Sequence, residues 1–248
     1  MQVDVVFRWA DLSPDEARGR VIVVIDVLRA TSMIAALLDA GAKEVWPVRE
    51  LNEAKQLAAR LDGALLAGER GGVPPPGFDM GNSPREVDPG KVRGVPVVVS
   101  TTNGTAAIQR CAAAEALVTA AFANIDAVVK FLLARDIRRL LVVCAGTRGS
   151  FSLDDTLCAG GIVSRLWAAG VSELSDSAIA ARLLYESQRE RLVPALRSCR
   201  HGQVLEGLGM GDDIEWAAVE GRIDVVPVRM GDPRGCRLVA AGDVQSTS

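Results

Sequence analysis

The sequence predicts an α/β fold in which a largely parallel sheet is covered by helices on both faces, as a layered α/β/α architecture. Strand-like and helix-like segments alternate along most of the chain, which is typical of proteins built from βαβ units. The run Val21–Ile25 is apolar at every position, as expected of a central parallel strand. A length of 248 residues, 49% of them hydrophobic, supplies the core of one large domain or of two smaller lobes.

The expected elements follow from this alternation. We expect strands over residues 3–7, 21–27, 43–48, 64–67, 95–100, 115–119, 139–145 and 223–229. We expect helices over residues 31–40, 50–61, 104–112, 124–134, 153–169 and 175–198. If the chain forms two α/β lobes, the N-terminal lobe covers 1–122 and the C-terminal lobe 123–248, with a frayed end over 243–248.

Composition excludes several classes of partner. The net charge of −3 gives no general attraction to nucleic acid or to an anionic lipid surface. The longest apolar run near the N-terminus, residues 21–25, is far too short to span a membrane. The five cysteines are odd in number and none are spaced as CxxC, so we expect a reducing cytoplasm and no disulfide framework or zinc site. Ala-rich helices over 104–114 and 153–169 could pack in a homodimer.

The first candidate segment follows the apolar strand at 21–27. Asp26 stands at the carboxyl end of this strand, where a catalytic carboxylate or metal ligand belongs in a parallel sheet. Arg29 could hold a phosphate or carboxylate with its two-pronged guanidinium. Thr31 or Ser32 would cap the next helix. The alternative is that Asp26 only caps the turn and that Arg29 is solvated.

The second candidate segment is the long irregular stretch over 68–84, which is rich in glycine and proline. Glu69 and Arg70 again follow a strand and are flanked by glycines, although an exposed ion pair in a turn is the simpler interpretation. Ser83 is expected to cap a helix that begins at Pro84. Asn82 lies just outside that helix start, where its amide could bind an anion.

The third candidate segment is a hydroxyl-rich turn between a β-branched strand and a helix. Backbone N–H groups of such a turn, and of the first helical turn after it, have no internal partners and favour an anion, usually phosphate. An ordinary capped corner is the alternative, but it does not explain so many hydrogen-bonding side chains in a row. The residues of this turn are Thr101, Thr102, Asn103, Gly104 and Thr105.

The last candidates lie in the second half of the chain. Ser152 and Asp155 have the spacing of a capping box, so capping explains Asp155 well. Asp154 is the better candidate for a hard cation such as Mg²⁺, which uses one or two carboxylates together with a substrate phosphate. His201 is the single histidine of the chain, which leaves it a structural role or one as an acid or hydrogen-bond donor toward a substrate.

The candidate segments support one another, because the carboxyl ends of parallel strands share one edge of a sheet. Carboxylates for a divalent metal, arginines for anions and helix starts for phosphate would then meet at that edge. Such a set of groups suits phosphoryl transfer or hydrolysis, where positioning and charge neutralisation supply most of the rate.

The same motifs, in the same order, resemble the 2-phosphosulfolactate phosphatase family. The resemblance covers about residues 20–228 and rests on DVLRATS at 26–32, GERGG at 68–72, GNSP at 81–84, TTNGT at 101–105 and SLDD at 152–155. It is looser around His201 and after it. The resemblance implies a Mg²⁺-dependent enzyme that cleaves 2-phospho-3-sulfolactate to sulfolactate and phosphate, a step towards coenzyme M.

The first hypothesis is therefore a phosphatase acting on a small anionic phosphoester. Asp26, Glu69 and Asp154 would be the metal-binding or catalytic carboxylates, the turn at 101–105 would hold the phosphoryl group, and Arg29 and Arg70 would neutralise developing charge. Two mechanisms remain open: Asp26 forms an aspartyl-phosphate, or a carboxylate activates a metal-bound water.

Two alternatives belong to other functional classes. An isochorismatase-like hydrolase would use a cysteine nucleophile, for which Cys144 is the candidate. A phosphometabolite-binding protein would use the same pocket without turnover. A phosphatase of the haloacid-dehalogenase type is disfavoured, because it needs Asp-x-Asp after the first strand and this chain has Leu28 at the second position.

Overall fold

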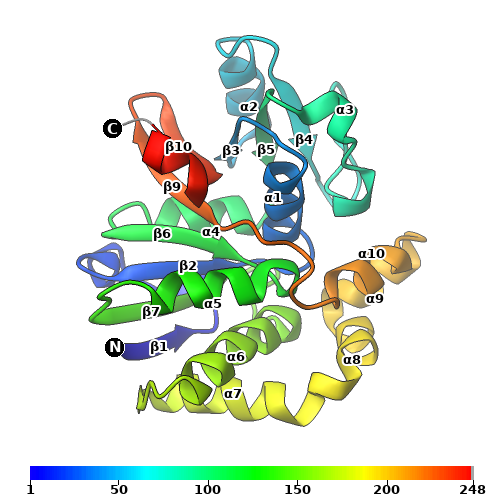
Figure 1. Cartoon of the computed structure of the whole chain (residues 1–248). Helices are drawn as coiled ribbons and strands as arrows, with labels where there is room; N and C mark the ends of the chain where they lie inside the picture. Colours follow the sequence, from blue (N-terminus) through cyan, green and yellow to red (C-terminus); the bar gives the residue numbers. More distant parts are fainter. Residues whose placement is uncertain (247–248) are drawn as a thin grey trace.

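The computed structural model describes residues 1–246 and confirms the layered α/β fold, with helices on both faces of one ten-stranded sheet (Figure 1). The strands are β1 Gln2–Val6, β2 Val21–Ile25, β3 Glu44–Val48, β4 Leu65–Gly68, β5 Pro96–Ser100, β6 Ala116–Ala120, β7 Arg139–Cys144, β8 Glu173–Leu174, β9 Pro227–Asp232 and β10 Gly235–Ala240. The helices are α1 Ala30–Asp39, α2 Leu51–Ala58, α3 Pro89–Val92, α4 Gly104–Arg110, α5 Ile125–Leu133, α6 Leu153–Ala168, α7 Asp176–Gln188, α8 Leu192–Ser198, α9 Arg200–Gly207 and α10 Gly211–Ala217.

The sheet consists of two parallel blocks joined by an antiparallel hairpin. The small block contains β4, β5 and β3, and the large block contains β6, β2, β7, β1 and β8. The hairpin β9–β10 lies between them, antiparallel to β6 on one side and to β3 on the other. Because β10, β9 and β6 each reverse the direction of the preceding strand, the strands of the two blocks run in opposite senses along the sheet.

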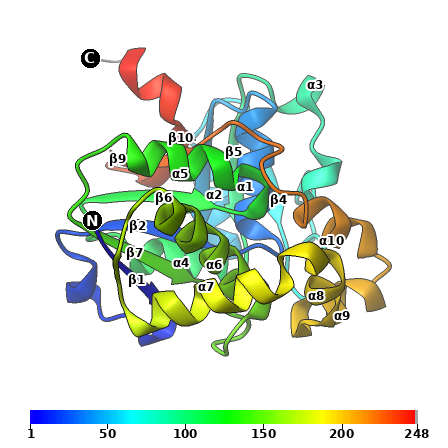
Figure 2. The same cartoon turned by 60° about the horizontal axis from the view of Figure 1, so that its bottom comes forward.

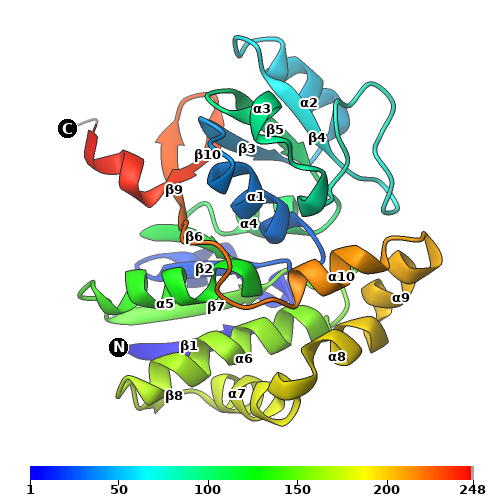
Figure 3. The same ribbon diagram turned by 45° about the vertical axis from the view of Figure 1, so that its right-hand side comes forward.

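Helices α1 and α4 lie between the two blocks, as Figure 3 shows. Alternate residues of a strand point to opposite faces, so Ile22 and Val24 of β2 face these helices, as do Val97 and Val99 of β5. The opposite faces of the same strands pack elsewhere: Val23 and its neighbours on α5 and α6, and the small block on α2. Helix α1 leads the chain from the large block to the small one, and α4 leads it back.

Helices α6 and α7 pack very closely on the outer side of the large block (Figure 2). Two glycines of α6, Gly160 and Gly161, make this approach possible. A Cβ atom on Gly160 would lie only 2.0 Å from the carbonyl oxygen of Ala181 in α7. The absence of a side chain at this position therefore sets the distance between the two helices.

Two expected elements differ from the structure. The helix expected over 175–198 is broken by a 3-10 turn at Arg189–Arg191, because Pro194 in the first turn of α8 has no N–H and its ring would collide with a helical carbonyl four residues earlier. The strand expected over 223–229 begins only at Pro227 and pairs with β10, which was not expected. The turn signature at 232–235, Asp-Pro-Arg-Gly, marks this hairpin.

The end of the chain is more ordered than a frayed tail. Residues Ala241–Ser246 form a 3-10 helix, and residues 247–248 lie outside the described part. The division at residue 122 stays a prediction; strands from both sides of it, such as β2 and β7, pair in the same sheet. Within residues 1–246, no helix combines the length and apolar character needed to cross a bilayer.

Replacing Gly160 by alanine should destabilise the protein, although alanine is otherwise the better helix former. The new Cβ atom would also lie 2.7 Å from the Cβ of Tyr185, so α7 would have to move away. We expect the free energy of unfolding, measured by urea denaturation, to fall by about 1–3 kcal/mol, as in overpacked cores.

The matched control for this substitution is Gly207→Ala at the end of α9, an exposed position where a Cβ atom meets nothing within 4 Å. This variant should be neutral or slightly stabilising. If both alanine variants unfold at the same urea concentration as the wild type, the close contact of α6 with α7 does not limit stability.

Candidate active site

The structure brings together the strand ends at which the sequence places its charged and hydroxyl side chains, but they do not share one edge of a single parallel sheet as expected. The two blocks run in opposite senses, and their approach depends on twist. Neighbouring strands rotate by about 20–25°, and five steps separate β5 from β2. The accumulated rotation, above roughly 100°, turns the carboxyl ends of the blocks toward each other.

Asp26 lies where the starts of α1 and α4 meet, and only 7% of its surface is exposed. Its Oδ1 accepts the N–H of Ala30 at 3.3 Å. A Cβ atom on Gly104 would come within 2.7 Å of its Oδ2, so only glycine allows α4 to begin here. Burial, and then the nearby carboxylates of Asp154 and Glu69, raise the pKa of Asp26 to about 7, although N–H groups of Ala30 and Gly104 oppose this. Asp26 can therefore hold or release a proton near neutral pH.

Arg29 is buried, and both of its terminal nitrogens are hydrogen-bonded within the protein rather than to solvent. Its Nη1 donates to Oδ2 of Asp213 at 2.6 Å, and its Nη2 donates to the carbonyl oxygen of Gly72 at 2.8 Å. The other carboxylate oxygen of Asp213 accepts from Oγ of Ser83 at 2.6 Å. Ser83 is therefore not the side-chain cap that we expected, and the segment after it is only a 3-10 turn, Pro84–Glu86. This network ties the β2–α1 turn to α10 and to the loop after β4.

The cap expected from Thr31 or Ser32 also differs. Helix α1 begins after Arg29 without a side-chain cap, and both hydroxyls lie inside its first turn. The Thr31 hydroxyl donates to the carbonyl oxygen of Asp26 at 2.8 Å, and the Ser32 hydroxyl donates to that of Val27 at 2.7 Å. These two hydroxyls therefore hold the turn that carries Asp26, and they do not cap the N–H groups at the start of the helix.

Glu69 occupies the hydroxyl-rich turn in which we expected phosphate. Its Oε1 accepts both the N–H and the hydroxyl of Thr102 at 2.9 Å, and its Oε2 accepts the N–H of Gly72 at 2.9 Å. Burial raises the pKa of Glu69, but these hydrogen bonds outweigh burial, and together with His201 they bring the pKa below its ordinary value. The anion at this turn is therefore a carboxylate of the chain itself.

The rest of the turn is also held by the protein. Thr105 donates its hydroxyl to the carbonyl oxygen of Thr101 at 2.8 Å, and its N–H faces the Thr101 hydroxyl at 3.4 Å. Asn103 accepts the N–H of Arg148 at 3.1 Å, which joins the turn to the loop after β7. These bonds fix the start of α4 and leave the amide nitrogen of Asn103 for other partners.

The acidic pair at the start of α6 does not form the expected capping box. Ser152 makes no side-chain cap, and its hydroxyl donates instead to Asp154 at 2.5 Å. Asp155 accepts the N–H of Val27 at 2.9 Å and that of Gly146 at 2.9 Å. Asp155 thus joins the ends of β2 and β7, while Asp154 lies close enough to Asp26 to raise its pKa.

Arg70 holds the small block together. Its Nη1 donates to the carbonyl oxygen of Glu69 at 2.7 Å, and its Nη2 donates to the hydroxyl of Ser100 at 3.0 Å and to the carbonyl oxygen of Arg49 at 2.5 Å. The guanidinium therefore links the ends of β3, β4 and β5 and positions the backbone of Glu69. Arg70 therefore does not form the exposed ion pair with Glu69 that a simple turn would have. Its side chain also does not line the cleft above Glu69.

A cleft of about 180 Å³ opens over Glu69. His201 lines it, and burial lowers the pKa of His201 despite the opposing charge of Asp154. His201 is therefore neutral at pH 7, where it can donate or accept a hydrogen bond. The cleft is lined by Glu69, Gly71, Gly72, Thr102, Asn103, Thr147, Arg148, Arg200, His201 and Val204.

Asn82 lies beside the end of β4, because Ala67 and Met80 form a parallel bridge just before it. It is buried, and its Oδ1 has no hydrogen-bond partner within residues 1–246. An unpaired buried polar atom is costly, so this amide has a capacity for a ligand that the fold does not use.

Cys144 does not have the surroundings of a nucleophile. It is completely buried at the end of β7, and burial, with the nearby Asp155, raises the pKa of its thiol well above the ordinary value. The isochorismatase-like alternative therefore lacks a thiolate that a substrate could reach.

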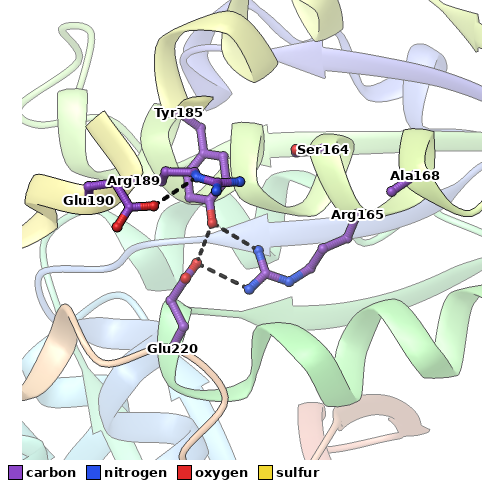
Figure 4. Close-up of a pocket in the computed structure, with 7 residues that line it drawn as sticks. All are labelled: Ser164, Arg165, Ala168, Tyr185, Arg189, Glu190 and Glu220. Carbon is purple, nitrogen blue, oxygen red and sulfur yellow. Dashed lines mark hydrogen bonds and ion pairs between the residues drawn. The ribbon is translucent and has the colours of Figure 1, made fainter. Parts of the chain in front are cut away.

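A second pocket, of about 440 Å³, lies between α6, α7 and the segment after α10, and its polar groups already satisfy one another (Figure 4). The Tyr185 hydroxyl donates to Glu220 at 2.9 Å and accepts from Arg165 at 3.2 Å. Arg165 also lies 3.3 Å from Glu220 and 2.7 Å from Asp126. Because these charges are paired, the larger pocket is a structural junction and the smaller cleft is the candidate site.

Comparisons with known proteins identify the family of the chain. Residues 7–231 match the family model described as 2-phosphosulpholactate phosphatase. The chain belongs to the 2-phosphosulfolactate phosphatase family. It is 42% identical over 225 residues to a protein of Thermotoga petrophila named "Probable 2-phosphosulfolactate phosphatase", an alignment that covers 91% of this chain and 94% of the relative. It is also 42% identical over 238 residues to the protein of that name from Deinococcus radiodurans, covering 94% and 98%.

Membership makes the chain a phosphoric monoester hydrolase, and two carboxylates fit the expected cation. Within residues 1–246, no cluster of three or more His, Cys, Asp or Glu side chains is arranged to hold a metal. Asp154 is nevertheless close enough to Asp26 to raise its pKa, and the buried Oδ1 of Asn82 has no partner among the described residues. Mg²⁺ needs only one or two carboxylates beside a substrate phosphate. Both carboxylate oxygens of Glu69 already accept hydrogen bonds from the chain, so we do not assign Glu69 to the cation together with Asp26 and Asp154.

Sequence reasoning missed three residues of the site: Asp213, Arg148 and Arg200. Asp213 follows Gly211 in the first turn of a helix that we did not expect, and acidic residues in that place are a helix-start signal. Arg148 precedes Gly149 in a tight turn, and Arg200 begins α9 beside His201. Nothing in the spacing of either arginine indicates that it reaches the cleft.

Replacing Asp213 by asparagine should destabilise the protein strongly, because the buried Arg29 cation would lose its counter-charge. Removing one partner of a buried ion pair typically costs about 3–5 kcal/mol. Asp212→Asn is the matched control, since this neighbouring carboxylate pairs with Arg85 at the surface, where ion pairs contribute little. Urea unfolding should separate the two variants clearly, and equal midpoints would contradict the importance of the buried pair.

Proposed function

We propose that the protein is a Mg²⁺-dependent phosphatase that hydrolyses 2-phospho-3-sulfolactate, or a closely related small phosphomonoester, to the alcohol and phosphate. The observation that carries this proposal is the buried pair Asp26 and Asp154 beneath a small cleft, at the meeting point of two helix starts. The names of the relatives support the substrate. A protein that only binds anions would gain nothing from carboxylates in this place.

Asp26 and Asp154 would hold the cation, which when bound neutralises charge on the phosphate oxygens and polarises the phosphorus. The chain supplies the rest of the chemistry. His201 and Asn103 orient the ester, and the bonds of Glu69 to the turn at 101–105 keep the geometry of this turn fixed. Arg29 and Arg70 act from behind the cleft, because they hold the backbone of Gly72 and of Glu69 in place.

The role of Asp26 in the chemical step is open between two mechanisms. In the first, Asp26 attacks phosphorus and the ester P–O bond breaks, so that the alcohol leaves after its oxygen takes a proton from water; a second water then hydrolyses the aspartyl-phosphate to free Asp26 and phosphate. In the second, the carboxylate takes a proton from an attacking water and the phosphoryl group is transferred once. Its fixed position at the end of β2 supports either mechanism.

We also propose that the enzyme works in the cytoplasm. The cysteines at 111, 144, 158, 199 and 236 are all unpaired, which supports a reducing cytoplasm. Formation of sulfolactate is consistent with a step towards coenzyme M. A homodimer through α4 and α6 stays a prediction; Ala106, Ala107 and Ala159 of these helices are already buried within one chain.

Phosphate release should be observed with racemic 2-phospho-3-sulfolactate and should be lost when EDTA removes the cation, then restored by excess Mg²⁺. Phospholactate and phosphoglycolate serve as comparison substrates. Release from other phosphoesters alone would keep the reaction and reassign the substrate. No release from any of them, together with thermal stabilisation by inorganic phosphate, would leave a binding protein.

Replacing Asp26 by asparagine should lower kcat by about a hundredfold to ten thousandfold, the range for loss of a general base, or by more if Asp26 is the nucleophile. The surface variant Asp212→Asn should retain activity. Acid quench of a single turnover separates the mechanisms: a trapped phospho-enzyme supports nucleophilic attack, and inversion at phosphorus without a trapped species supports direct attack by water. Wild-type turnover in D26N would exclude both.

A further inference from the structure

Two arginines line the cleft without an internal partner. Arg148 lies in the loop after β7 and Arg200 begins α9, so two separate segments bring them to the same cavity. Within residues 1–246, neither guanidinium makes a hydrogen bond or an ion pair, whereas Arg29 nearby is paired with Asp213. Arginine side chains that face a cavity and lack a carboxylate are available to an anionic ligand.

The fold holds Arg148 at a definite place. Thr147 and Ser150 exchange two backbone hydrogen bonds of 3.0 Å around the turn, and Arg148 itself has φ of 52°. This left-handed conformation is uncommon for a residue with a side chain. The N–H of Arg148 donates to Asn103, and Arg8 donates to the carbonyl oxygen of Gly149 at 3.2 Å. The turn is thus fixed from both sides, and it holds the backbone of Arg148 in one place at the cleft.

Charge in the cleft is divided between its floor and its rim. Glu69 lies at the floor, with Asp26 and Asp154 buried close to it, and these groups suit a cation and the phosphate that binds to it. Arg148 and Arg200 bring positive charge to the rim. A ligand that satisfies both regions needs one anionic group for the floor and a second for the rim.

We propose that Arg148 and Arg200 bind a second anionic group of the substrate, a carboxylate or a sulfonate on the carbon next to the phosphate ester or one further. This inference rests on the proposed function and assigns its specificity. A cleft near 180 Å³ is well below the roughly 300–1,000 Å³ of sites for drug-sized ligands. It therefore selects short substrates in which the two anions lie only a few bonds apart.

The test compares substrates that share the phosphate ester and differ in the second anion. Arg148→Gln and Arg200→Gln should each raise KM for 2-phospho-3-sulfolactate by about ten- to a hundredfold, the loss expected for a hydrogen bond between charged groups. Hydrolysis of isopropyl phosphate, which has no second anion, should change little. An equal loss for 2-phospholactate would assign the arginines to the carboxylate, and a loss confined to the sulfonated substrate would assign them to the sulfonate.

Arg138→Gln is the matched control, because Arg138 is exposed at the opposite end of β7 and its side chain has no partner among the described residues. It changes the net charge equally and should leave KM unchanged. If R148Q and R200Q behave like R138Q, or if they weaken isopropyl phosphate as strongly as the doubly anionic substrates, the inference is wrong.

A binding measurement separates this inference from the proposed function. Titration calorimetry of sulfolactate with the wild type and the variants measures binding at Arg148 and Arg200, without any turnover. If the wild type hydrolyses no phosphoester but binds sulfolactate and R148Q does not, the proposed function fails and only anion binding by the arginine remains. If the wild type hydrolyses the substrate while all variants bind sulfolactate equally, the inference fails alone.

Discussion

The site depends on one close approach, that of Gly104 to Asp26. Helix α1 leaves the large block and α4 leaves the small block, and both begin against the same carboxylate. A Cβ atom at 104 would lie 2.5 Å from the Cβ of Ala30 and would separate the two helix starts. Because these helices also fill the space between the two parallel blocks, the close approach of Gly104 to Asp26 sets the angle between the blocks. It sets the position of Asp26 at the same time.

Electrostatics explains why so many carboxylates around Asp26 are hydrogen-bonded or ion-paired. Burying several carboxylates is costly unless N–H groups, hydroxyls or cations compensate them. Asp155 and Glu69 are compensated by backbone N–H groups from neighbouring loops, and Asp213 by Arg29 and Ser83. Asp26 and Asp154 lie close together without a cationic side chain paired to either among the described residues, and the charge of Asp154 helps to raise the pKa of Asp26, so this pair is our candidate for cation binding.

Much of the fold could be predicted from the sequence, because continuous apolar strands and alternating helices leave a strong local signal. The boundaries of β2, β5 and β7 were expected within two residues, and so was the placement of Asp26 and Glu69 at strand ends. The hairpin β9–β10 was missed, so the opposite sense of the two blocks was missed with it. No local pattern reports that reversal, because it depends on which strands pair across most of the chain.

Individual contacts were harder to predict than positions. Hydroxyl and carboxylate side chains near a helix start can cap it or bond elsewhere, and sequence cannot choose between these outcomes. Ser83 and Asp155 had capping patterns, yet each bonds a group outside its own helix start. Thr102 had the expected anion-binding donors, but their partner, Glu69, comes from another strand. Tertiary partners decided each case.

The most direct measurement is a crystal structure of the wild-type chain with Mn²⁺ in place of Mg²⁺, in which anomalous scattering locates the ion. The account predicts one ion bound by carboxylate oxygens of Asp26 and Asp154, beneath the cleft that Arg148 and His201 line. An ion bound elsewhere with this pair left free, or no ion at a concentration that supports turnover, would contradict the central role of the two carboxylates.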